Sequence, residues 1–139
     1  MSGPPRYLVD TNILLRFITG DPASQAAAAK KLFTRAAAGE VLLDCSAVIV
    51  AETYYTLLSF YSVERKVAAE KLSFLLQQHG VKLRDSSQVF AALQSLQTTN
   101  VGFTDAYLAA GASEEGVSVA SFDRDFNKFK EIVRYEPDA

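Results

Sequence analysis

Apolar and polar residues follow one another along the chain in blocks that predict short strands separated by longer helices. Short apolar runs bounded by polar residues or glycine are typical of buried strands, and they occur at 7–9, 41–43, 81–83, 117–120 and 132–134. Segments with helical spacing or composition occupy 11–19, 23–38, 46–60, 62–79, 85–97 and 104–115, with a helical turn at 126–129. Strands that alternate with helices favour a parallel sheet with helices on both faces. We therefore expect an α/β fold.

Candidate capping residues indicate where several of these helices begin. Asp21 suits an N-cap and Pro22 the first helical position that follows it. Ser46 and Ser62 are expected to open the third and fourth helices. The stretch 85–88 resembles a capping box, in which the first and last side chains satisfy backbone N–H groups at the start of a helix.

Composition narrows the class of protein. The 139 residues are 49% hydrophobic and 22% charged, which fits one ordinary globular domain spanning 1–139 and excludes a disordered chain. A net charge of -2 argues against a broadly basic nucleic-acid coat, although a local basic patch remains compatible with it. One cysteine and one histidine exclude a disulfide framework, a cysteine zinc site and mechanisms that need two histidines. The chain has no apolar stretch that predicts a signal peptide or membrane helix, so we expect a cytoplasmic protein.

Three carboxylates stand alone in otherwise uncharged segments. Asp10 is the only charged side chain in 7–15, Glu52 the only one in 45–63, and Asp105 the only one in 86–113. A fourth, Asp123, directly follows the apolar run near 117–122. Burying a carboxylate without a partner costs several kcal/mol, and no basic residue lies in the first three segments. A divalent cation such as Mg²⁺ or Mn²⁺ is a candidate partner, because hard ions prefer oxygen ligands.

The predicted fold places these acids near one another. In open parallel sheets, ligands bind at the carboxyl ends of the strands. Asp10 ends the first strand, Asp123 follows the fourth, and Asp105 lies in the first turn of the helix that precedes the fourth strand. Glu52 lies roughly 9 Å along its helix at ~1.5 Å per residue. It reaches the same edge only because side chains lean toward the helix N-terminus.

Ordinary structural roles remain open for each acid. Asp10 and Asp123 could be N-caps, and Asp105 could complement a helix dipole. Glu52 would need an arginine or lysine from elsewhere in the chain. Asp125 is expected to cap a helix or support the site. Hydroxyl and amide groups that could orient a carboxylate or a metal-bound water belong to Thr11, Asn12, Thr104 and Ser121. Arg16 and Arg124 are candidates for contact with a phosphate backbone.

Four acidic motifs in this order resemble the PIN domain family, and most of all its VapC-type toxins. The motifs are VDTNILLR at 9–16, AE at 51–52, FTDA at 103–106 and SFDRDF at 121–126. The resemblance implies a three-layer α/β/α sandwich with a central, mostly parallel sheet. It also implies RNA cleavage dependent on Mg²⁺ or Mn²⁺, a homodimer, and inhibition by a small cognate antitoxin protein. PIN domains that process RNA outside toxin–antitoxin systems are the alternative within the family.

The resemblance also assigns residues. The family's catalytic, metal-binding acids fall on Asp10, Glu52, Asp105 and Asp123, and its supporting polar positions fall on Asn12 and Ser121. Ser121 stands where the family more often has threonine, a change that keeps the hydroxyl.

Other classes of function fit the residues less well. A phosphotransferase of the haloacid-dehalogenase type wants a second aspartate two residues after the first, where this chain has Asn12. A glycosidase needs only two carboxylates, but this chain has four candidate acids and no tryptophan. A non-catalytic RNA- or protein-binding module that uses metal for structure alone remains open.

Overall fold

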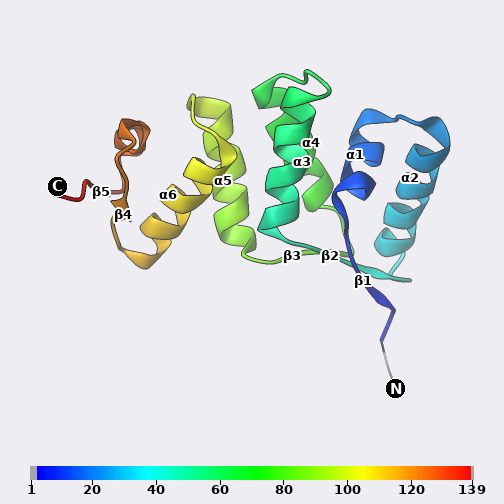
Figure 1. Cartoon of the computed structure of the whole chain (residues 1–139). Coiled ribbons are helices and arrows are strands. Elements are labelled where there is room, and N and C mark those ends of the chain that lie inside the picture. Colours follow the sequence, from blue (N-terminus) through cyan, green and yellow to red (C-terminus); the bar gives the residue numbers. More distant parts are fainter. Residues whose placement is uncertain (1–2, 139) are drawn as a thin grey trace. The chain divides into compact units, whose positions relative to one another are not determined.

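The computed structural model describes residues 3–138 (Figure 1). The chain divides into two compact units, with the bounds Met1–Asp85 and Ser86–Ala139. Each unit combines parallel strands with helices.

Unit 1 is built on a three-stranded parallel sheet of order β1-β2-β3. Its elements are β1 (Arg6–Leu8), α1 (Thr11–Thr19), α2 (Ala23–Ala37), β2 (Leu42–Cys45), α3 (Ala47–Ser59), α4 (Arg65–Leu76) and β3 (Val81–Leu83). The core includes the fully buried side chains of Leu14, Leu43, Tyr54 and Leu72. Helices therefore carry the chain from each strand back to the start of the next, and all three carboxyl ends lie at one edge.

Gly80, the residue before β3, lies very close to the end of α2. The residue has a φ of +87°, and a Cβ placed there would collide with the backbone of Ala36. A non-glycine residue would meet both an unfavourable backbone conformation and this clash. The turn into β3 therefore depends on glycine.

Unit 2 contains two packed helices and a two-stranded parallel sheet. Its elements are α5 (Ser86–Thr98), α6 (Phe103–Glu115), β4 (Val119–Ala120), the 3-10 helix η1 (Arg124–Lys128) and β5 (Arg134–Tyr135). The Gln88 side-chain amide donates to the Tyr107 carbonyl at 2.8 Å and so ties α5 to α6. Phe126 and Phe129 are buried and anchor the segment between β4 and β5.

The predicted α/β class with parallel strands is confirmed, but the N-caps expected for the second and fourth helices are wrong. The second helix begins at Ala23 with Pro22 as its N-cap and no side-chain capping bond, because Pro22 has extended rather than helical backbone angles. The fourth helix begins at Arg65 after Glu64, because Ser62 adopts a left-handed φ of 53° that an N-cap does not use. Strand β3 has the expected bounds, and the bounds of the other four strands differ by one or two residues from those expected.

Helix length bears on the predicted absence of membrane segments. Within residues 3–138, no helix is both long and apolar enough to span a bilayer.

Candidate active site

Asp10 lies at the junction between β1 and α1 in unit 1. Its extended backbone makes it the N-cap of α1, and its Oδ1 accepts the backbone N–H of Thr11 at 2.8 Å. The side chain is exposed. The capping role that the sequence left open is therefore present, and it orients the carboxylate at the positive end of α1.

Glu52 lies beside the same helix start, although it belongs to α3. The Thr11 hydroxyl donates a hydrogen bond to Glu52 Oε1, and Thr11 itself is buried. Thr11 thus contacts Asp10 through its backbone and Glu52 through its side chain. Unit 1 therefore brings together two of the four predicted acids, Asp10 and Glu52, although Glu52 lies well inside its helix.

A pocket of 320 Å³ lies at the carboxyl edge of the unit 1 sheet. Asp10 follows β1, Ser46 follows β2 and Arg84 follows β3, and all three line it. Its other lining residues are Leu8, Val9, Asp44, Cys45 and Ile49. This is the position where parallel α/β sheets bind ligands.

Asp44 is a carboxylate that the sequence reading did not single out. It is 3% exposed, and it is the buried acid among the residues described. Arg6 Nε donates to its Oδ2 at 2.6 Å, Arg6 Nη2 pairs with the same oxygen, and Arg84 Nη2 lies 4.0 Å away. Asp44 is therefore neutralised within unit 1. Burial and the charge of Asp44 raise the pKa of the Cys45 thiol to about 11, so Cys45 is no nucleophile at neutral pH.

Asp105 lies in the first turn of α6 in unit 2 and is half-buried. Burial raises the pKa of its carboxyl, and the negative charges of Asp123 and Asp125 raise it further. These acids therefore repel one another in the ionised state, which a bound cation would relieve.

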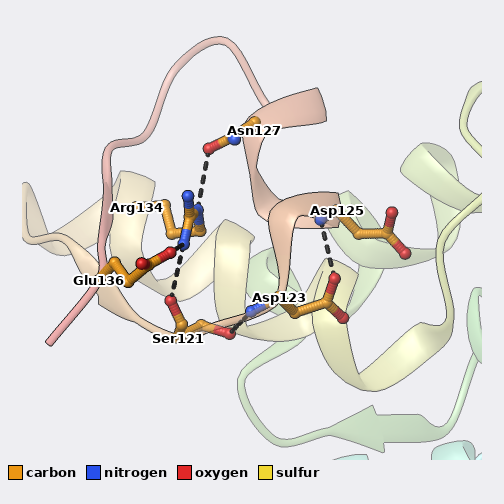
Figure 2. Close-up of polar contacts among 6 residues, drawn as sticks. All are labelled: Ser121, Asp123, Asp125, Asn127, Arg134 and Glu136. Atoms are coloured by element: carbon orange, nitrogen blue, oxygen red, sulfur yellow. Dashed lines mark hydrogen bonds and ion pairs between the residues drawn. The ribbon is translucent and has the colours of Figure 1, made fainter. Parts of the chain in front are cut away.

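Asp123 is the N-cap of η1 and is held by two hydrogen bonds (Figure 2). Its Oδ1 accepts the backbone N–H of Asp125 at 2.8 Å, and its own N–H donates to Ser121 Oγ at 2.9 Å. The Asp125 carboxylate pairs with Lys128 at 3.2 Å. Ser121 therefore contacts the backbone of Asp123, and Asp123, not Asp125, caps the short helix.

The candidate metal ligands differ from Asp44 in ion pairing and exposure. Asp10, Glu52 and Asp123 are exposed, so the expectation of burial is wrong for Asp10, which lies at an element end, and for Glu52, which lies on a helix surface. Within residues 3–138, none of the four forms an ion pair with a basic side chain. Their oxygens suit Mg²⁺ or Mn²⁺ in chemistry.

The four acids are divided equally between the units. Asp10 and Glu52 belong to unit 1, while Asp105 and Asp123 belong to unit 2. In the described part of the chain, no three histidine, cysteine, aspartate or glutamate residues are grouped so that they could hold a metal ion. A single site built from all four remains a prediction.

The remaining candidates occupy α1, α6 and η1. Asn12 and Arg16 line a pocket of 200 Å³ with Gln25, and Arg16 donates to Gln25 Oε1 at 2.8 Å and to the Tyr61 hydroxyl at 3.2 Å. Thr104 is exposed in the first turn of α6, and Arg124 is exposed at the start of η1.

The parallel strands and the acids at their carboxyl ends define an α/β protein of the kind that binds ligands at a sheet edge. A model of the PIN domain matches residues 7–132, and the chain belongs to this family. One similar solved structure is the crystal structure of VapBC2 from Rickettsia felis bound to a DNA fragment from their promoter. That match has 17% sequence identity and a TM-score of 0.38, and it covers 94% of this chain and 97% of that one. A search of curated proteins found no match.

Proposed function

We propose that this protein is a divalent-metal-dependent endoribonuclease that hydrolyses RNA phosphodiester bonds. PIN domains are typically nucleases and generally bind divalent metals, and the family match covers 7–132. The observation that carries the proposal is the contrast in pairing. The family's acidic positions fall on four carboxylates without an ion-pair partner in the described chain, whereas Asp44 has Arg6.

Phosphodiester hydrolysis requires an activated water, neutralisation of phosphoryl charge and a stabilised leaving oxygen, all of which a divalent ion supplies when bound. Asp10, Asp105 and Asp123 would hold Mg²⁺ or Mn²⁺. Glu52 would bind a second ion or orient the attacking water. The raised pKa of Asp105 supports this assignment, because it comes from burial and then from the negative charges of Asp123 and Asp125, and those charges would attract a cation.

The chain's own contacts prepare these groups. The Thr11 hydroxyl orients Glu52 by donating to Oε1, and the backbone N–H of Asp125 fixes one oxygen of Asp123. Arg16 is held by Gln25 and Tyr61, which are both uncharged, so its charge remains for a phosphate. Arg124 is exposed beside Asp123 and would contact the backbone of the same RNA.

The test is cleavage of an end-labelled single-stranded RNA with Mg²⁺, with Mn²⁺ and with EDTA. We expect cleavage with either metal, none with EDTA, and products with 5′-phosphate and 3′-hydroxyl ends. The Asp10→Asn variant, purified in parallel, controls for contaminating nucleases and should be inactive. Equal cleavage by the variant would refute the site assignment. RNA binding without cleavage in either metal would favour a non-catalytic binding module.

We further propose that this protein is the toxin of a type II toxin–antitoxin pair, acting in the cytoplasm as a homodimer with a small cognate antitoxin. The support is the resemblance of the motifs at 9–16 and 121–126 to VapC-type toxins. Induced expression should arrest growth, and co-expression of a small protein encoded beside it should restore growth. Undisturbed growth with retained RNA cleavage would favour an RNA-processing role instead.

A further inference from the structure

Arg134 bonds to both ends of the segment 121–127, which carries Asp123, and to Glu136, and it lies beyond the stretch 7–132 that the family model matches. Its side chain is 14% exposed. Its Nη1 donates to the Ser121 carbonyl at 3.0 Å and to Glu136 Oε1 at 2.7 Å, and its Nε donates to Asn127 Oδ1 at 3.1 Å (Figure 2). A guanidinium is suited to this role, because it carries five N–H donors in a rigid plane.

Two of these contacts lie on opposite sides of Asp123 in the sequence. Ser121 precedes it and accepts its backbone N–H, and Asn127 lies on η1, the helix that Asp123 caps. Arg134 therefore fixes both ends of the segment 121–127 that carries the carboxylate. The parallel pairing of β5 with β4, in which Arg134 is opposite Val119, brings the side chain to this position.

The ion pair with Glu136 determines how the charge of Arg134 affects Asp123. Because Glu136 pairs with the guanidinium, the charge of Arg134 is balanced by an acid outside the segment 121–127. Asp123 is thus held by an arginine without forming an ion pair with it. Its negative charge remains available for a cation.

We propose that Arg134 is a positioning residue that preorganises Asp123 for a divalent cation. The inference rests on the proposed function, in which Asp123 is a metal ligand. A ligand whose backbone is already ordered loses less conformational entropy on binding, so affinity rises. Groups that orient metal ligands typically contribute about 10- to 100-fold to metal affinity or activity.

The test compares Arg134→Gln, Arg134→Lys, Asn127→Ala and the control Lys130→Gln. Lys130→Gln removes the same charge from an exposed side chain in the same region. Direct Mn²⁺ binding is measured by electron paramagnetic resonance, and RNA cleavage is measured against Mn²⁺ concentration. We expect Arg134→Gln to raise the Mn²⁺ Kd and the half-activating concentration by about 10-fold. The kcat at saturating Mn²⁺ should change much less.

Arg134→Lys should give a smaller rise in Kd because a lysine keeps a donor for the Ser121 carbonyl, and Lys130→Gln should give none. An unchanged Kd in a folded Arg134→Gln variant would overturn the inference. If that variant fails to fold, Asn127→Ala provides the test, because it removes the bond from Arg134 to η1 and leaves the arginine in place. An unchanged Kd in Asn127→Ala would then overturn the inference. Wild-type protein that binds Mn²⁺ but does not cleave RNA would contradict the proposed function alone. Absence of Mn²⁺ binding would overturn both.

Discussion

An aspartate near the end of β2 and another after β4 each have an arginine nearby, but the two arginines make different contacts. In unit 1, Arg6 bonds directly to the buried Asp44. In unit 2, Arg134 bonds to the segment around Asp123 and pairs with Glu136. The first arrangement neutralises a carboxylate and stabilises the fold. The second orders the segment that carries a carboxylate and leaves that carboxylate without an ion pair. Whether an acid is ion-paired therefore distinguishes a structural acid from a candidate functional acid better than its position at a strand end does.

The strongest way to break this comparison is to neutralise one acid of each kind. Asp123→Asn should lower kcat/KM for RNA cleavage by at least about 1000-fold, or about 4 kcal/mol of transition-state stabilisation. The fold should persist, because asparagine also caps helices. Asp44→Asn should retain cleavage within a few-fold while lowering the urea midpoint. Equal losses of activity in the two variants, measured with excess Mn²⁺, would remove the distinction.

The Asp44 side of the comparison predicts an effect on stability. Arg6→Gln leaves a buried carboxylate with Arg84 at 4.0 Å as its basic neighbour in the described chain. We expect a loss of about 2 kcal/mol in the free energy of unfolding, below the full penalty for breaking a buried pair because Arg6 is itself partly exposed. Urea denaturation measures it. Adding Asp44→Asn should recover much of the loss.

Arg35→Gln is the matched control for that measurement. Arg35 pairs with Glu40 at 3.4 Å, and both side chains are well exposed. Exposed pairs contribute about 0 to 1 kcal/mol, so this variant should unfold close to the wild type. A similar loss in Arg6→Gln and Arg35→Gln would show that Asp44 does not depend on its arginine.

The carboxyl of Asp105 in unit 2 predicts a smaller effect that depends on pH. The pKa of Asp105 is raised, chiefly by burial and then by Asp123 and Asp125, so the folded state holds this proton more tightly than the unfolded state. Its contribution to stability is therefore present at low pH and is lost as pH rises through the raised pKa. In EDTA, Asp105→Asn should be more stable than wild type at neutral pH.

Urea midpoints of the two proteins from about pH 4 to about pH 8 measure this effect across the range where carboxyl groups titrate. The advantage of Asp105→Asn should shrink toward the acid end and should also shrink when Mn²⁺ is added to the wild type. An advantage that is constant with pH would mean that the substitution acts through packing and not through charge.

Sequence spacing predicted the local features of this molecule better than its distant pairings. Ser46 caps α3 as expected, and Gly116 ends α6 in a left-handed conformation. Asp10 and Glu52 stood out because their segments carry no other charge. The link between Arg6 and Asp44 spans 38 residues and depends on strand register, which composition does not reveal. Arg134 was missed for the same reason, since its partners are brought to it by the pairing of β5 with β4.

The smallest expected effect concerns the hydroxyl that orients Glu52, the unit 1 counterpart of Ser121 beside Asp123. Thr11→Val keeps the size of a buried side chain but removes its donation to Glu52. Loss of one hydrogen bond, about 1 kcal/mol, predicts a decrease of about 5-fold in kcat, and Thr11→Ser should restore most of it. Thr34→Val is the control, because that exposed hydroxyl donates to the Lys30 carbonyl of its own helix. If Thr11→Val and Thr34→Val cleave RNA equally well, Thr11 packs in the core without orienting Glu52. Preorganisation of an acid by neighbouring hydrogen-bond donors would then be limited to Asp123 in unit 2.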